Sequence, residues 1–256
     1  MNEENNSKGI ILVLVSMALF SFQDALIKFV FEKAALYEIY FGRTFIASVI
    51  LGTYLFIKKQ KIKFKTEYPF LTAIRVLLHF FAFSFFFISL TYMSLAMANA
   101  LFFSSPFFIS IFAKFFLNEQ IGIRRWSAIF LGFIGIFIVL NPDFSEFEYK
   151  NLLPVLCAFF YAISMTITKI TSDKDNLYTQ LFYFYTLAIG LCLIIFIFFG
   201  SGEFNKYNDP TMQFIFREWF SNTTYAWKYI LIMGATASIS FVCIFKAYSS
   251  YSPSVV

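Results

Sequence analysis

The stretch Gly9–Val30 reads GIILVLVSMALFSFQDALIKFV, and its length and composition decide the kind of fold that this chain forms. As an α-helix it would be about 33 Å long, and the hydrocarbon core of a bilayer is about 30 Å thick. Within the stretch, only Asp24 and Lys28 carry a charge. The stretch is therefore predicted to cross a membrane as a helix.

The composition of the whole chain agrees with a membrane protein. Of its 256 residues, 59% are hydrophobic and only 14% are charged. Soluble domains carry roughly 25% charged residues, and a chain of this size has too little interior to hide so much apolar surface from water. The net charge of +5 does not indicate a nucleic-acid partner, because the basic residues lie mainly between the apolar runs. The expected surroundings are the lipid bilayer.

Seven further apolar runs follow the first one along the sequence. Most reach the roughly 20 residues that a membrane-spanning helix needs. The connectors are short and polar except between Ser201 and Trp227, so no separate soluble domain is expected. We predict an all-α integral membrane protein with eight transmembrane helices, at Gly9–Val30, Leu36–Ile57, Phe70–Tyr92, Ser94–Leu117, Trp126–Asn141, Leu152–Ile170, Leu177–Gly200 and Lys228–Ser249.

The long connector contains the signal for one short additional helix. Asp209 is a residue that caps helix N-termini, and Pro210 suits the first helical position. Apolar residues follow at helical spacing from Met212 onward. A short helix at the membrane interface is therefore predicted to begin here.

The distribution of lysine and arginine predicts the orientation of the chain. Short cytoplasmic connectors are richer in these residues than connectors on the opposite side. A cytoplasmic N-terminus places ten basic residues inside and five outside, so we expect a multi-pass protein of the inner membrane with this orientation. The inner residues are Lys8, Lys58, Lys59, Lys61, Lys63, Lys65, Arg124, Arg125, Lys169 and Lys174, and the outer ones are Lys33, Lys150, Lys206, Arg217 and Lys228.

The two halves of the chain match each other when one is shifted along the other. At a shift of 141 residues, Phe20 is opposite Tyr161 and Lys28 is opposite Lys169. The match extends without a gap through the first predicted helix and its connector. The first predicted helix therefore corresponds to the sixth.

A second match, at a shift of 156 residues, sets Thr91–Ser94 against Ala247–Ser250. Helices one to three thus correspond to helices six to eight, and a complete unit has five helices. Because five is odd, the second unit enters the membrane from the opposite side, which is an inverted repeat. We expect a first repeat over residues 9–142 and a second over 150–256. The second would lack most of its last two helices, which leaves eight helices and the start of a ninth out of ten.

The stretch from Ile88 to Pro142 reads ISLTYMSLAMANALFFSSPFFISIFAKFFLNEQIGIRRWSAIFLGFIGIFIVLNP. Ser105 and Pro106 form a Ser-Pro pair within a helix. Glu119 and a basic pair then precede a helix with spaced glycines that ends at Pro142. The order and spacing of these features resemble the drug/metabolite transporter permeases of the EamA type.

This resemblance implies secondary active transport of a small organic metabolite by alternating access, through a cavity between two five-helix units. It favours amino-acid-derived or nucleoside-like substrates, with a proton or a counter-solute as the coupling partner and a monomer or homodimer as the assembly. The incomplete second unit leaves two alternatives: an inactive truncated permease, and a non-transporting scaffold or channel-like subunit. No enzyme, cofactor or metal site is predicted, because one histidine and no close pair of deep carboxylates offer little chemistry.

Charged residues deep in a membrane are costly and therefore mark candidate functional positions. Asp24 is about 9 Å from the outer end of its predicted helix, and Arg43 is about 10 Å from the outer end of the next one. Consecutive antiparallel helices can bring these opposite charges together. We interpret the two residues as a gate or proton-coupling pair, with a structural ion pair as the alternative.

Other polar residues at membrane depth are candidates for substrate binding. Arg75 and His79 are one helical turn apart and share a face, so Arg75 is expected to bind a substrate carboxylate or phosphate and His79 to form a hydrogen bond with the substrate. Asn99 and Ser105 lie beside a helix-interrupting proline, and Tyr161 offers a hydroxyl in the second half. The excess of deep basic groups predicts an anionic or zwitterionic substrate.

Overall fold

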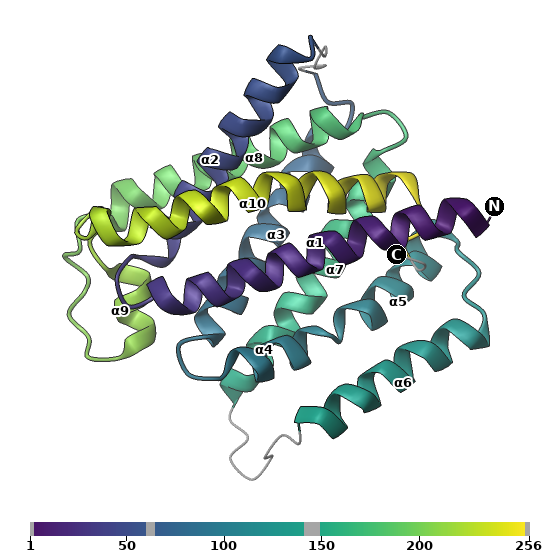
Figure 1. Ribbon diagram of the computed structural model, residues 1–256, viewed down its shortest axis with the longest axis horizontal. Helices are drawn as coiled ribbons and strands as arrows, with labels where there is room; N and C mark the ends of the chain where they lie inside the picture. Colours follow the sequence, from purple (N-terminus) through teal and green to yellow (C-terminus); the bar gives the residue numbers. More distant parts are fainter. Residues whose placement is uncertain (1–2, 60–64, 141–148, 254–256) are drawn as a thin grey trace.

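The computed structural model describes residues 3–59, 65–140 and 149–253, and the regular structure within these ranges is helical (Figure 1). Predicted features at residues outside the ranges, such as Lys61, Lys63 and Pro142, are not described. The helices are α1 (Glu3–Val30), α2 (Leu36–Ile57), α3 (Pro69–Ser89), α4 (Leu95–Phe102), α5 (Ser105–Leu117), α6 (Ile123–Leu140), η1 (Tyr149–Leu152), α7 (Leu153–Thr171), α8 (Leu177–Phe199), α9 (Pro210–Phe216) and α10 (Thr223–Ser250).

Within the described ranges, seven helical segments are long and apolar enough to cross a membrane, so the chain is a multi-pass membrane protein. They correspond to seven of the eight predicted spans. The remaining predicted span, Trp126–Asn141, coincides with α6. The described apolar part of this helix, Trp126–Gly135, is shorter than a membrane span, and Asn141 lies outside the described residues. The seven segments are Ser7–Val30, Leu36–Ile57, Pro69–Ser89, Leu95–Leu117, Tyr149–Thr171, Leu177–Phe199 and Thr224–Ser250.

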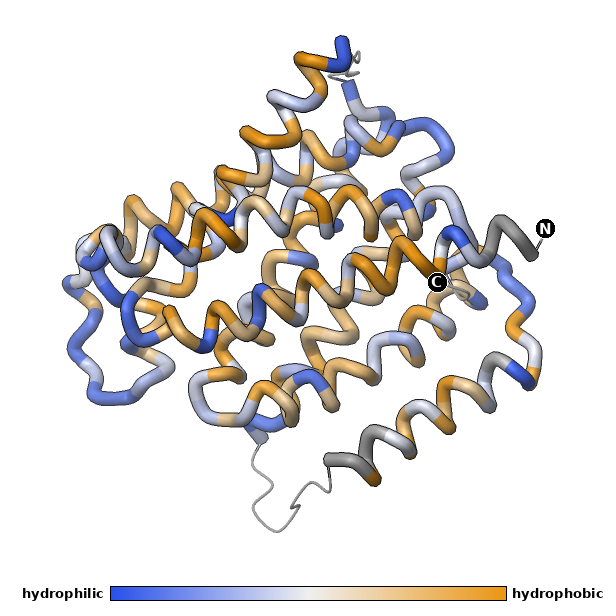
Figure 2. The backbone as a smooth tube through the Cα atoms, in the orientation of Figure 1, coloured by the Kyte–Doolittle hydropathy of each residue, from blue (hydrophilic) through white to orange (hydrophobic). Residues whose placement is uncertain are grey.

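Apolar side chains on the outside of the helices agree with a lipid environment. Phe56 is 85% exposed, Ile197 75% and Phe29 64%. In Figure 2, hydrophobic residues run along the helices, whereas hydrophilic residues gather in the connectors. Exposed rings and branched chains of this kind would be unfavourable in water but contact lipid at no such cost.

The helices pack in two main pairs that cross the molecule. α1 lies along α10, and α3 lies along α7 (Figure 1). α2 packs between α10 and α8, α5 covers α7, and α6 lies at the edge, where it contacts α4. The interior contains many aromatic side chains, including Phe87, Phe184, Phe241 and Phe245, which are fully buried.

Two glycines allow the close approach of α2 and α10. A Cβ on Gly42 would be 2.5 Å from Ile230, and one on Gly234 would be 2.5 Å from Ile46. At α6, by contrast, a Cβ added at Gly132 would meet no described atom within 4 Å. Glycines therefore allow close packing between α2 and α10, where small residues let the backbones approach.

Polar contacts fasten the connectors at both ends of the molecule. Near the α7–α8 connection, the Asp175 carboxylate accepts hydrogen bonds from the Thr66 hydroxyl and, at 3.1 Å, from the Glu67 amide. Near the α1–α2 connection, Arg217 donates to the carbonyls of Phe31 (2.8 Å) and Ala34 (3.2 Å). We name these contacts the Asp175 clasp and the Arg217 clasp.

The predicted short helix in the long connector is present as α9. Asp209 caps it by accepting a hydrogen bond from the Met212 amide at 3.0 Å, and Pro210 is its first residue. Phe214 of this helix is completely buried and packs against Phe31, with ring centroids 6.0 Å apart. The helix thus covers the end of α1.

Candidate functional site

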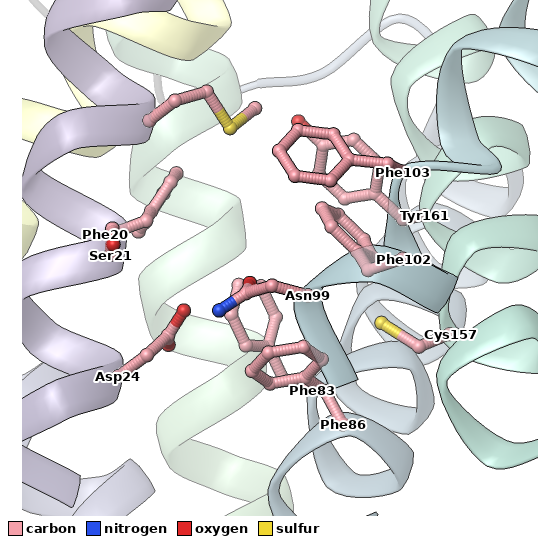
Figure 3. Close-up of a pocket in the computed structure, with 11 residues that line it drawn as sticks. Phe20, Ser21, Asp24, Phe83, Phe86, Asn99, Phe102, Phe103, Cys157 and Tyr161 are labelled. Atoms are coloured by element: carbon pink, nitrogen blue, oxygen red, sulfur yellow. The ribbon is translucent and has the colours of Figure 1, made fainter. Parts of the chain in front are cut away.

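A cavity of about 220 Å³ lies among α1, α3, α4 and α7 (Figure 3). Its walls are mostly aromatic, and its polar groups come from opposite sides. The lining residues are Met17, Phe20, Ser21, Asp24, Phe83, Phe86, Asn99, Phe102, Phe103, Cys157 and Tyr161.

Asp24 is the charged residue of this lining. It lies on α1 and faces Asn99 of α4, whose amide group points toward it across the cavity (Figure 3). Asp24 is 7% exposed, and in the described part of the chain neither its carboxylate nor the Asn99 amide has a hydrogen-bond partner. Both groups are therefore available to a ligand in the cavity.

The aromatic rings of the cavity come from several helices and contact one another. Phe102 of α4 lies 5.5 Å from the Tyr161 ring and 5.8 Å from the Phe86 ring, between centroids. Phe20 of α1 lies 6.1 Å from Phe83 of α3. Such rings attract cations through their faces and stack on flat ring systems, so the walls suit a ligand with either feature.

The break between α4 and α5 positions the α4 side of the cavity. Ser94 begins α4 by accepting a hydrogen bond from the Met97 amide at 3.2 Å. α4 ends at Phe102, and α5 restarts at Ser105 just before Pro106. Proline lacks the amide hydrogen that would continue the helix. The predicted interruption is therefore present, and it leaves Asn99, Phe102 and Phe103 on the cavity wall.

Arg43 lies beside the cavity, in an aromatic enclosure. Its guanidinium carbon is 5.0 Å from the Phe83 ring centroid, 5.2 Å from that of Tyr40 and 5.5 Å from that of Phe87. The side chain is buried, and none of its three nitrogens has a hydrogen-bond partner among the described residues. Asp24 is near enough to interact with it electrostatically, but no direct hydrogen-bonded ion pair joins these two described side chains.

Arg75 and His79 are not among the residues that line the cavity. Arg75 donates to the side-chain oxygen of Gln180 at 2.7 Å and to the Gln180 carbonyl at 2.9 Å, so it fastens α3 to α8. His79 packs among rings, with centroids of Phe83 and Phe184 both at 4.8 Å. The shared face that the sequence predicted is therefore directed toward the helix interface with α7 and α8.

Of the other predicted site residues, Asn99 and Tyr161 line the cavity, and Ser105 is buried at the start of α5 outside the lining. The sequence did not single out Phe20, Ser21, Phe83, Phe86 or Cys157 as site residues. One signal was available for Phe20: the predicted repeat sets it opposite Tyr161, and both line the cavity.

The fold defines a polytopic membrane protein with a central cavity among its helices. A family model described as the EamA-like transporter family matches residues 7–141. The chain belongs to this family, which indicates a transporter and not an enzyme.

Individual relatives agree with this membership. An S-adenosylmethionine uptake transporter of Rickettsia felis is 33% identical over 175 residues, which make up 68% of this chain and 59% of the relative. A riboflavin transporter of Vibrio cholerae is 36% identical over 96 residues, or 38% of this chain and 32% of the relative. The chain thus spans less than two thirds of the length of these relatives.

A solved structure has the same fold over nearly the whole chain. It is a crystal structure of a protein that aligns with a TM-score of 0.73 at 14% identity, and the alignment covers 97% of this chain and 82% of the other. At this identity the similarity concerns the fold alone. The fold thus extends beyond residues 7–141 into the second half.

Proposed function

We propose that the chain is a secondary active permease for a small zwitterionic metabolite that carries a cationic centre and an aromatic ring system. The observation that carries the proposal is the lining of the cavity, where the Asp24 carboxylate and the Asn99 amide face each other between aromatic walls. The carboxylate attracts a positive charge, and the rings add cation–π attraction and stacking. A neutral apolar solute would leave Asp24 without a partner.

The charge of the expected substrate follows from which residues line the cavity. The sequence favoured an anionic or zwitterionic substrate because Arg43, Arg75 and His79 outnumber Asp24 among the deep charged or basic groups. These three lie outside the lining, and Asp24 is inside it. The proposal therefore keeps the zwitterionic substrate and sets aside a purely anionic one.

The name of one relative supports this chemistry. The Rickettsia felis relative is named as an S-adenosylmethionine uptake transporter. S-adenosylmethionine has a sulfonium cation, an amino-acid group and an adenine ring. The sulfonium suits Asp24 and the ring faces, and the adenine suits stacking against Phe102 or Tyr161. We propose this compound class as the substrate.

The proposed mechanism is alternating access between two inverted units in an inner membrane, with the N-terminus inside. Corresponding helix pairs support the repeat, because α1 packs along α10 as α7 packs along α3. The Asp175 clasp and the Arg217 clasp hold connectors at opposite ends of the molecule and are suited to act as gates. The proposal includes a proton or a counter-solute as the coupling partner, in a monomer or a homodimer.

Counterflow in proteoliposomes tests the proposal. Vesicles that contain the purified protein and are preloaded with unlabelled S-adenosylmethionine are expected to accumulate the labelled compound transiently and saturably. Asp24→Asn is expected to abolish this accumulation, whereas Glu203→Gln, at an exposed connector residue, is the matched control.

The same experiment separates the proposal from its alternatives. A channel-like subunit would give flux that does not saturate and shows no counterflow, and a non-transporting scaffold or an inactive permease would give none. Normal counterflow in the Asp24→Asn protein, at unchanged pH dependence, would refute the role of this carboxylate.

A further inference from the structure

Arg43 and Arg75 are equally buried, but they differ in how their charges are satisfied. Arg43 is 1% exposed and Arg75 is 0% exposed. Arg75 has two hydrogen bonds to Gln180, whereas Arg43 has none from any of its nitrogens in the described structure. A buried charge without hydrogen bonds is strongly unfavourable, so one that is retained needs a reason.

Further polar groups without partners surround Arg43. The buried hydroxyls of Tyr40, Thr44 and Tyr185 also lack hydrogen-bond partners among the described residues. Tyr40 and Thr44 are one turn apart on α2, so they share a face. Tyr185 packs against Phe241 at 6.0 Å, and the Arg43 guanidinium lies 5.8 Å from the same ring. The Arg43 guanidinium and the Tyr40 and Tyr185 rings therefore belong to one buried aromatic cluster.

This region adjoins the cavity of the proposed site. Phe83 belongs to the cavity lining, and its ring contacts the Arg43 guanidinium at 5.0 Å. Phe20 also lines the cavity, and it packs against Phe241 at 5.4 Å. Phe20 and Phe83 thus form a partition of side chains between the cavity and the Arg43 region.

We propose that Arg43 is the carboxylate-binding subsite of the transported zwitterion, reached when the Phe83 ring turns aside. The inference rests on the proposed function, which places the cationic centre of the substrate at Asp24. A guanidinium forms two parallel hydrogen bonds with a carboxylate, and the hydroxyls of Tyr40 and Tyr185 supply further donors. The two ends of the substrate then meet opposite charges in adjoining compartments.

The arrangement also explains why Arg43 and Asp24 do not form a direct ion pair. A bound zwitterion would present its own carboxylate to Arg43 and its own cation to Asp24. Each protein charge would then gain a partner that no described protein group provides. Substrate specificity would follow from the need for both charges.

Two compounds that differ only in the carboxylate test this inference. Competition against labelled S-adenosylmethionine uptake is measured for S-adenosylmethionine and for its decarboxylated analogue, which keeps the sulfonium and the adenine. The wild-type protein is expected to bind the analogue roughly 10- to 100-fold more weakly, as for the loss of a charged hydrogen-bonded pair. Equal binding of both would overturn the Arg43 subsite and leave the proposed function intact.

Absence of saturable binding of either compound would instead overturn the proposed function, and the inference with it.

Substitutions of the two buried arginines show which residue distinguishes S-adenosylmethionine from its decarboxylated analogue. Arg43→Met removes an unpaired charge and keeps an apolar side chain of similar length, so it is expected to raise the melting temperature without ligand. It should also bring the affinity ratio of the two compounds close to one. Arg75→Met is the matched control: it removes the donor to the side-chain oxygen and the carbonyl of Gln180, lowers the melting temperature and preserves the ratio. A ratio that persists in Arg43→Met would overturn the assignment.

Discussion

Lys28 and Lys169, which the predicted repeat sets opposite each other, both donate hydrogen bonds to backbone carbonyls near the end of a neighbouring helix. Lys28 donates to the carbonyls of Leu90 and, at 3.5 Å, of Met93 at the end of α3. Lys169 donates to the carbonyl of Ser249 at 3.1 Å near the end of α10. The lysines are 141 residues apart and the carbonyls of Met93 and Ser249 are 156 apart, which are the two shifts of the sequence match. The contacts support the proposed repeat.

Replacing either lysine is expected to destabilise the protein to a similar extent. Lys28→Met and Lys169→Met each remove hydrogen bonds from an ammonium group to carbonyls at a helix end, worth about 1 kcal/mol for partly exposed groups. Thermal unfolding in detergent measures the change. Lys8→Met, at an exposed position of α1, is the control and should leave the melting temperature unchanged. A large effect at only one of the two lysines would contradict their equivalence.

Breaking the Asp175 clasp is expected to loosen the segment that precedes α3. Asp175→Asn keeps the shape of the side chain but weakens the hydrogen bonds from Thr66 and the Glu67 amide, because a neutral amide is the poorer acceptor. Hydrogen–deuterium exchange of the peptide over residues 65–69 should accelerate.

Asp173→Asn is the control for this measurement. Asp173 accepts a hydrogen bond from the Tyr68 hydroxyl and holds no backbone amide in the described contacts. Its replacement should therefore change the exchange of this peptide less than Asp175→Asn does. An equal change in both proteins would show that the Asp175 contacts do not hold the segment.

The close approach of α2 and α10 predicts that alanine is poorly tolerated at Gly234. The added Cβ would lie 2.5 Å from the Cβ of Ile46 and 3.1 Å from the Arg43 carbonyl, so the helices must separate. We expect Gly234→Ala to lower the melting temperature, by an amount that corresponds to about 1–3 kcal/mol. Gly132→Ala, where the described structure has open space, should have no such effect. Equal melting temperatures for the two variants would refute the close contact.

The hydrogen bond between Tyr68 and Asp173 predicts a measurable titration. The Asp173 carboxylate accepts from the Tyr68 hydroxyl at 2.9 Å, which favours the protonated phenol and raises the pKa of Tyr68 above its usual range. The bond is therefore complete below the ordinary tyrosine pKa and is lost as the pH rises through the raised value. NMR of ¹³C-labelled tyrosine follows the titration, with Tyr68→Phe to assign the signal. Asp173→Asn should lower the Tyr68 pKa, and an unchanged value would argue against the bond.

Much of the fold could be predicted from local sequence. The range predicted for the second span, Leu36–Ile57, coincides with α2, and the Asp209-Pro210 pair begins α9 as expected. These features depend on residues close to one another along the chain, such as an apolar run long enough to span a bilayer or a capping side chain. The break before Pro106 is of the same kind.

The candidate site was predicted only in part, because a cavity depends on contacts between helices. The predicted depth of polar residues in the membrane marked Asp24, Asn99 and Tyr161, which do line the cavity. It could not show that Arg75 donates hydrogen bonds to Gln180, which is 105 residues away. It also could not distinguish Gly132, which has open space, from Gly234, which meets Ile46.

The sequence by itself determined that this chain lies in a membrane as a set of helices and resembles the EamA-type permeases, since hydrophobic length and motif spacing are local properties. Only the tertiary structure decided which polar residues share a space. Arg43 is buried beside Phe83 and has no hydrogen bond to any described residue. Arg75 is equally buried but donates hydrogen bonds to Gln180. The physical reason is that the cost of a buried charge depends on its neighbours in space, and the packing of several helices brings those neighbours together.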